Sequence, residues 1–182
     1  LLGAPLATAL KAVIFNRAIN TTTLPYLSDH RKHGSTLYPA TAYLEMGLQA
    51  AGHLFGEGAH HFEDLAITDP LVLAAGTDVE IQVIATPRGA DTAEFQLFSR
   101  GGTMDPWRQH ATGTLRRDAS APPATDIAAI RSACAQPLDA AAYYEAMRRD
   151  GHEFGPAFQV VRSVQRGENC AIGRLELDAD ER

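Results

Sequence analysis

Apolar residues recur with a helical period between positions 40 and 55. They fall around a wide arc of the predicted helix, and Glu45 and His53 are the only titratable side chains at its edges. Pro39 suits the first turn of a helix, and Gly56 suits its end. The pattern therefore predicts one long helix that is buried on most sides.

Period-two alternation on both sides of this helix predicts β-strands. Turn-forming pairs such as Asp69-Pro70 and Gly101-Gly102 separate the strands at short intervals, which favours an antiparallel sheet. Between the first strand and the helix, the polar segment 21–38 is predicted to be a loop. The sequence thus predicts an α+β hot-dog fold, in which an antiparallel sheet wraps around one long central helix. The strands are predicted at 11–20, 62–68, 71–73, 79–87, 93–99 and 107–115.

The composition changes after the last of these strands. Residues 118–137 are rich in Ala, Pro, Asp and Ser, which predicts a linker with a short helix at 127–133. Beyond it, a helix is expected at 139–150 and strands at 158–165 and 171–177. These elements are too few to bury their own apolar faces. We therefore expect an N-terminal hot-dog at 1–117, a linker at 118–137 and the incomplete beginning of a second hot-dog at 138–182.

Length, composition and charge narrow the class of protein. The chain has 182 residues, 45% hydrophobic and 21% charged, as in globular proteins, and its net charge of −6 argues against nucleic-acid binding. It has no apolar run of membrane-spanning length and no targeting signal. Cys134 and Cys170 lie far apart, so neither a disulfide framework nor a zinc site is indicated, and a cytoplasmic location is expected. Because the chain begins at Leu1 without Met, we expect it to be a piece of a longer polypeptide.

His30 is the candidate for catalysis, because its loop leads into the start of the buried helix. Unpaired backbone N–H groups at 40–42 could polarise a carbonyl group, and a nearby imidazole could take a proton from the adjacent carbon. Together they would form an enolate. A single histidine in a loop is, however, more often solvated or packed, and spacing alone leaves that alternative open.

Two motifs in the chain resemble those of dehydratase domains in modular polyketide synthases. The run His30-x-x-x-Gly34-x-x-x-x-Pro39 matches the HxxxGxxxxP signature of that family, and residues 151–158, Gly-His-Glu-Phe-Gly-Pro-Ala-Phe, resemble its GYxYGPxF motif. The flanking Leu27-x-Asp29 and the segment 43–46 resemble the family as well, as does the opening Leu1-Leu2-Gly3. The resemblance spans the whole chain.

The resemblance implies a double hot-dog domain that removes water from a β-hydroxyacyl chain, and this chain would hold its first half. The acyl chain would be carried on the phosphopantetheine of an acyl carrier protein, with no cofactor of the enzyme's own. His30 would be the base. The resemblance also implies neighbouring synthase domains as partners and a homodimer. Substrate binding would involve Gly34, Leu37, Tyr38, Pro39, Ala40, Gly155 and Pro156.

The chain departs from the family pattern at several positions. Ala40 stands where glycine is usual after the proline, and His152 and Phe154 replace tyrosines, so Phe154 is expected only to pack. The family's catalytic Asp lies beyond the strand predicted at 171–177, so this chain alone is expected to lack it. The run Asp105-Pro-Trp-Arg-Gln fits the letters of that acid motif but is interpreted as a turn.

Several alternatives stay open at the level of sequence. The same fold could carry a double-bond isomerase, a pyran-forming cyclase or a catalytically silent scaffold domain, and a hot-dog thioesterase is a further possibility. Asp29 is interpreted as an acceptor that anchors the loop rather than as a partner of His30 in a triad. The histidine pairs His30/His33 and His60/His61 lack the further ligands that a metal site needs. The basic pairs 31–32 and 148–149 could meet an acidic carrier protein, although solvated faces are commoner.

Overall fold

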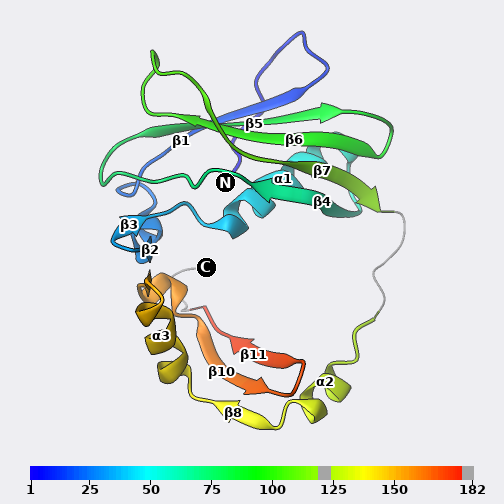
Figure 1. Cartoon of the computed structure of the whole chain (residues 1–182). Coiled ribbons are helices and arrows are strands. Elements are labelled where there is room, and N and C mark those ends of the chain that lie inside the picture. The colour runs from blue at the N-terminus through cyan, green and yellow to red at the C-terminus, as the bar shows by residue number, and fades with distance from the viewer. Residues whose placement is uncertain (119–123, 178–182) are drawn as a thin grey trace. The chain divides into compact units, whose positions relative to one another are not determined.

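The computed structural model describes residues 1–118 and 124–177, which form two compact units (Figure 1). The described part of the first unit is 1–27 and 37–118, and that of the second is 28–36 and 124–177. The predicted domain bounds of 1–117, 118–137 and 138–182 remain a prediction. The two compact units differ from these bounds at 28–36, because that segment belongs to the second unit and not to the first. The Pro122-Pro123 pair and residues 178–182 lie outside the described residues.

The first unit has a five-stranded antiparallel sheet with strand order β1-β5-β6-β7-β4. Helix α1 (Ala40–Phe55) lies against one face of this sheet, and its bounds are those that the sequence predicts. One helix against a curved antiparallel sheet is the hot-dog arrangement, so the predicted fold class is confirmed for this unit. The strands are β1 (Val13–Ile19), β4 (Ala59–Ile67), β5 (Val79–Pro87), β6 (Thr92–Arg100) and β7 (Arg108–Asp118).

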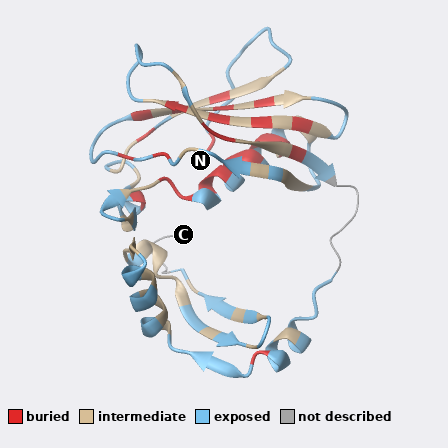
Figure 2. Cartoon of the chain, viewed as in Figure 1, coloured by how far each residue is buried: buried red, intermediate tan, exposed pale blue. Residues whose placement is uncertain are grey.

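The core of the first unit lies between α1 and the sheet. Inward positions alternate along β5 and β6, where every second residue is buried (Figure 2). The helix approaches β4 closely, because a Cβ atom at Gly47 would lie 2.0 Å from Cζ of Phe62. Phe62 in turn packs edge-on against Phe95, with 5.1 Å between the ring centroids. Gly47 therefore makes room for an aromatic side chain between the helix and the sheet.

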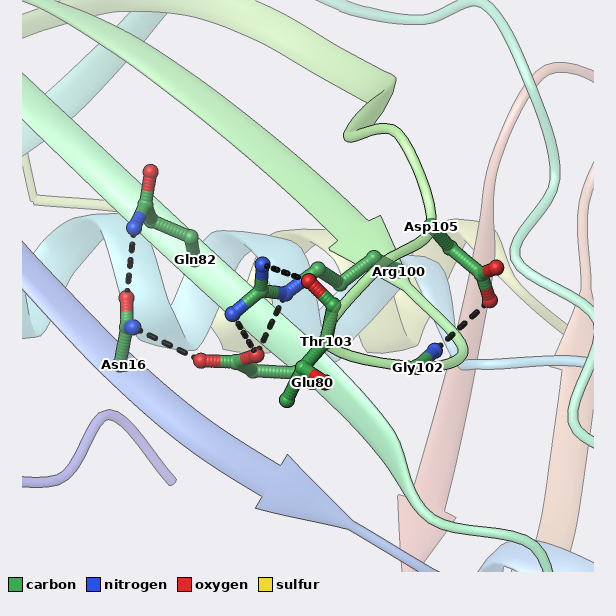
Figure 3. Close-up of polar contacts among 7 residues, drawn as sticks. All are labelled: Asn16, Glu80, Gln82, Arg100, Gly102, Thr103 and Asp105. Carbon is green, nitrogen blue, oxygen red and sulfur yellow. Dashed lines mark hydrogen bonds and ion pairs between the residues drawn. The ribbon is translucent and has the colours of Figure 1, made fainter.

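The outward positions of the same strands carry a polar network (Figure 3). The Gln82 side-chain amide donates to Asn16 Oδ1 (2.8 Å), and the Asn16 amide donates to Glu80 Oε1 (2.9 Å). The Arg100 guanidinium donates to Glu80 Oε2 (2.6 Å) and lies over the Trp107 ring, 4.4 Å from its centroid. Polar outward positions paired across three neighbouring strands explain the period-two pattern of the sequence.

The predicted strand at 71–73 is wrong. Leu71 and Leu73 are buried and Val72 is exposed, so the alternation is real, but the segment makes only an isolated bridge between Val72 and Leu37. The Leu71 carbonyl accepts a hydrogen bond from the Tyr38 N–H (2.9 Å). An alternating pattern without a neighbouring strand therefore does not produce a ladder.

The second unit contains two three-stranded sheets, with strand orders β3-β2-β9 and β11-β10-β8. The prediction that 21–38 is a loop is wrong in part, because this segment contains a short 3₁₀ helix, η1 (Pro25–Asp29), and two strands, β2 (His30–Lys32) and β3 (Ser35–Thr36). The strand predicted at 158–165 begins later, because a second 3₁₀ helix, η2 (Pro156–Phe158), precedes it. The other strands are β8 (Gln136–Leu138), β9 (His152–Phe154), β10 (Val161–Arg166) and β11 (Ala171–Leu175).

The two helices of the second unit follow the sequence prediction closely. Helix α2 (Ile127–Ala133) has the predicted bounds, and α3 (Ala140–Arg149) begins after Asp139, whose carboxylate accepts from the N–H groups of Ala141 and Ala142. This is the usual N-cap interaction. Among the described residues, no helix is both long and apolar enough to cross a membrane.

Candidate active site

His30 lies on β2, which pairs with β9 of the second motif in an antiparallel register. His30 lies opposite Phe154, Arg31 opposite Glu153, and Lys32 opposite His152. The pairing joins segments about 120 residues apart, as the Lys32–His152 separation shows. The two motifs that the sequence analysis singled out are therefore parts of one small sheet, and the second motif holds the loop that carries the histidine.

Aromatic rings from the second motif pack against the His30 imidazole. The centroid of the Phe158 ring lies 4.9 Å from that of His30, and the centroid of the Phe154 ring lies 5.5 Å away. His30 itself is half-buried. The expected packing role of Phe154 is confirmed by this contact. Such rings restrict the orientation of the imidazole and limit the access of water to one side of it.

Asp29 anchors the loop, as the sequence analysis predicts. Its Oδ2 accepts a hydrogen bond from the Ala157 N–H (2.9 Å), and its backbone carbonyl accepts from the Gly155 N–H (2.8 Å). A Cβ atom at position 155 would lie 2.3 Å from Cγ of Asp29, so only glycine fits this approach. Pro156 begins η2, which presents the Ala157 N–H to the carboxylate. Asp29 is thus an acceptor directed at the second motif.

The turn between β2 and β3 consists of His33 and Gly34, which both have positive φ (48° and 78°). The His33 N–H donates to the carbonyl of Gly151 (2.8 Å), and the Gly34 N–H donates to Glu153 Oε1 (2.9 Å). Gly34 therefore has a conformational role in the turn, because glycine adopts positive φ without strain. Its predicted contact with substrate stays a prediction.

His152, the histidine that replaces the family's first tyrosine, lies between Lys32 of β2 and Asp150, the residue that follows α3. Its Nε2 lies 3.1 Å from Lys32 Nζ, and its Nδ1 lies 3.3 Å from Asp150 Oδ2. A neutral imidazole can accept the Lys32 hydrogen bond at Nε2 while its Nδ1–H faces the carboxylate. Sequence reasoning missed this link, because a residue's partner across a sheet has no local signal.

The remaining predicted substrate-binding residues, Leu37, Tyr38, Pro39 and Ala40, belong to the first unit. Tyr38 is buried, and its hydroxyl donates to Met46 Sδ (3.7 Å). Burial raises the pKa of the Tyr38 phenol. Ala40 is the exposed first residue of α1, directly after Pro39. The binding roles of these residues, and the proximity of His30 to the start of α1, stay predictions.

Two other titratable side chains of the first unit, those of Asp105 and His110, have structural partners. Asp105 lies in the turn between β6 and β7, where its Oδ2 accepts from the Gly102 N–H (2.8 Å; Figure 3), as its interpretation as a turn residue predicts. His110, which sequence reasoning missed, is buried and lies 2.7 Å from Ser99 Oγ and 2.9 Å from the Asp69 carbonyl. Among the described residues, no group of three or more His, Cys, Asp or Glu side chains could hold a metal ion.

These features define a hot-dog protein in which a second sequence motif clamps a histidine loop. The chain belongs to the polyketide synthase dehydratase family. The model of the polyketide synthase dehydratase domain matches residues 1–100, and that of the polyketide synthase dehydratase N-terminal domain matches residues 122–182. The family that the two motifs resemble is therefore confirmed.

Individual relatives agree with the family models. The polyketide synthase GfsA of Streptomyces halstedii is 32% identical over 98% of this chain and 2% of its own length. A solved dehydratase associated with the borrelidin and fluvirucin polyketide synthases is 32% identical, with a TM-score of 0.85 over 99% of this chain and 63% of that chain. The CurK dehydratase, at 24% identity, shares the fold, with a TM-score of 0.91 over 99% of this chain and 66% of that chain. The chain thus spans a small fraction of GfsA and about two thirds of the solved dehydratases.

Proposed function

We propose that this chain supplies the base for dehydrating a β-hydroxyacyl thioester to the α,β-unsaturated thioester during polyketide synthesis. The substrate would be carried on the phosphopantetheine of an acyl carrier protein. The observation that carries the proposal is the pairing of β2 with β9, which fixes His30 in a sheet built from both family motifs. The partners would be the carrier protein, neighbouring synthase domains and a second copy of the enzyme, in the cytoplasm.

In the proposed reaction, the His30 imidazole removes a proton from the carbon next to the thioester carbonyl. The electron pair of that C–H bond forms the new double bond, and the bond between the β-carbon and the hydroxyl oxygen breaks. In the first turn of α1 the Ala42 N–H already donates to the Pro39 carbonyl (3.0 Å), so the N–H groups of Ala40 and Thr41 would stabilise the negative charge on the thioester oxygen. Histidine suits the role of base because its ordinary pKa lies near neutral pH.

The hydroxyl group must be protonated as it leaves, and we infer that the proton donor lies outside residues 1–182. The carboxylate adjacent to His30 in sequence is that of Asp29, which already accepts the Ala157 N–H and packs against Gly155. The CurK dehydratase is described as inactive with a His→Phe substitution and, separately, with an Asp→Asn substitution. A base on this chain and an aspartic acid elsewhere would account for both requirements.

The test is dehydration of a 3-hydroxyacyl carrier protein by the full-length protein that carries this chain, followed as the loss of one water mass from the acyl group. His30→Ala should abolish turnover and leave the melting temperature nearly unchanged. His33→Asn is the matched control, because asparagine tolerates the positive φ of that position. Unimpaired turnover by His30→Ala would refute the proposal. Product analysis would also reveal isomerisation or ring closure.

A further inference from the structure

The only two cysteines of the chain, 36 residues apart, lie in contact in the second unit. The Sγ atoms of Cys134 and Cys170 are 3.0 Å apart, and neither is in a disulfide. Cys134 caps the end of α2, where its N–H donates to the Ile130 carbonyl (3.0 Å) and its side chain is 1% exposed. Cys170 precedes β11 and is half-buried. Cys134 is therefore buried, and Cys170 is the more exposed residue of the two.

The backbone around the two thiols holds them together. The Gly167 N–H donates to the Cys170 carbonyl (2.8 Å), which closes the turn between β10 and β11. A Cβ atom at Gly167 would lie 2.7 Å from Cys170 Sγ and 2.4 Å from the Ala133 carbonyl oxygen. The turn thus packs directly against the residue before Cys134. A side chain at position 167 would collide with Cys170 Sγ and with the Ala133 carbonyl group.

An open pocket of about 480 Å³ lies between the end of α2 and the turn that precedes Cys170. It is lined by Ala133, Ala135, Gln136, Arg166, Gly167 and Glu168, which flank both cysteines along the chain. Its lining carries one cationic side chain, Arg166, and one anionic side chain, Glu168. A pocket of this size with charges of both signs has room for a small zwitterionic disulfide such as oxidised glutathione.

We propose that Cys134 and Cys170 form a thiol–disulfide exchange site that reacts with low-molecular-weight disulfides. The Cys170 thiolate attacks one sulfur of the reagent, which forms a mixed disulfide and releases the first thiolate. Cys134 then loses its proton and attacks the Cys170 sulfur, which forms the Cys134–Cys170 bond and releases the second thiolate. The two cysteines lose two electrons and two protons, and the reagent is reduced to two thiols.

The order of attack follows from the surroundings of each sulfur. Cys134 is buried and Cys170 is half-buried, so the reagent meets Cys170 first. The hydrogen bond to Cys170, and secondarily burial, also raise the pKa of the Cys134 thiol. The product would tie the end of α2 to the turn between β10 and β11. Because glutathione keeps cytoplasmic thiols reduced, the bond would form under oxidative conditions and reverse afterwards.

The proposal is tested on the folded full-length protein in glutathione buffers of increasing oxidised fraction, quenched with acid and digested with trypsin without reduction. Trypsin releases Cys134 within residues 132–148 and Cys170 within residues 167–174. We expect these two peptides to become covalently joined, two hydrogen atoms lighter than their sum, and to separate again on reduction. Oxidation should raise the melting temperature on the order of 5 °C, because the bond closes a loop in the unfolded chain.

Two single variants resolve the order of reaction. Cys134→Ser should accumulate a glutathione adduct on the 167–174 peptide, because no second thiol displaces it. Cys170→Ser should leave Cys134 unmodified while the protein is folded. Separate adducts on both cysteines of the native protein without a joined peptide, or two unreactive cysteines, would overturn the proposal. The peptide measurement on the wild-type protein remains valid even if a variant fails to fold. It does not use dehydration activity, so its result is independent of the proposed function.

Discussion

At the scale of single residues, the structure separates the roles of two neighbours in the first motif. The His30 ring packs against Phe154 and Phe158, whereas the Asp29 carboxylate accepts the Ala157 N–H. Gly155 was predicted to bind substrate, and the contacts of the structure give it an anchoring role beside Asp29. A substrate contact stays a prediction for Gly155, but its lack of a side chain already has a physical reason.

Adding a methyl group at position 155 tests this anchor. Gly155→Ala would drive its Cβ into the Asp29 side chain, which is fixed by its own hydrogen bond, so we expect a loss of roughly 1–3 kcal/mol in the free energy of unfolding. The matched control is Gly173→Ala in β11, where the nearest atom to the new Cβ, Ser163 O, is at an ordinary 3.5 Å. Denaturant unfolding of both variants measures the difference. Equal free energies of unfolding for the two variants would contradict the anchoring role of Gly155 beside Asp29.

Two buried phenols predict an alkaline limit to the stability of the first unit. Burial raises the pKa of Tyr43 to about 12 and raises that of Tyr38 as well, relative to an ordinary value near 10. Above pH 10 the folded state therefore holds more protons than the unfolded state. The contribution of the two protonated phenols to the free energy of unfolding should be fully present below pH 10. It should fall as the pH rises, by at most about 1.4 kcal/mol per pH unit for each phenol. Unfolding of Tyr43→Phe between pH 9 and 12 should show a shallower fall, and an identical profile would contradict this reasoning.

At the scale of elements, the sequence predicts best what is decided locally. Helix α1 and strand β5 have their predicted bounds because a 3.6-residue period and a two-residue period are local signals. Strands β2 and β9 were not predicted, because neither alternates and each is defined by the other across the chain. The Lys32–His152 contact was missed for the same reason. The motifs could be found in the sequence, but not the way in which they meet.

Two glycines of α1 test how the helix fits the sheet. Gly47→Ala would place a methyl group 2.0 Å from Cζ of Phe62, and we expect a cost of about 1–3 kcal/mol for overpacking. Gly52→Ala meets no atom within 4 Å and should stabilise the helix by up to about 1 kcal/mol. Chemical denaturation of both variants compares one substitution at two sites on one helix. A stabilised Gly47→Ala variant would mean that the helix does not lie as close to β4 as described.

At the scale of the whole molecule, the two units bury their apolar residues unequally. The first unit has a continuous core, whereas the second unit is mostly exposed or half-buried (Figure 2). Leu138, Leu175 and Leu177 of the second unit are 38%, 66% and 56% exposed. The sequence predicts uncovered apolar surface on the strands of the second unit, because its elements are too few to form a core. These exposed leucines agree with that expectation. Self-association, or the addition of a segment from outside the chain, would cover them.

A base within residues 1–182 and an acid outside them would leave residues 1–182 alone with little dehydratase activity. If the proton donor lies outside residues 1–182, as we propose, this chain should dehydrate 3-hydroxyacyl thioesters at a rate close to background, because general acid assistance is typically worth about 10²–10⁴-fold. The assay compares the chain with the full-length protein on one carrier-bound substrate. Comparable rates would mean that a carboxylate within residues 1–182 is the acid, and the inferred external donor would be wrong.

In the proposed reaction, the His30 imidazole exchanges a proton with the α-carbon of the acyl thioester. The reverse reaction measures this exchange directly, when the full-length protein acts on an α,β-unsaturated acyl carrier protein in D₂O. Hydration by the wild-type protein should place one deuterium on the α-carbon of the 3-hydroxyacyl product, read by mass spectrometry of the released acyl group. The His30→Ala variant should place none. Deuterium on the α-carbon at the same rate in both proteins would contradict the assignment of His30 as the base.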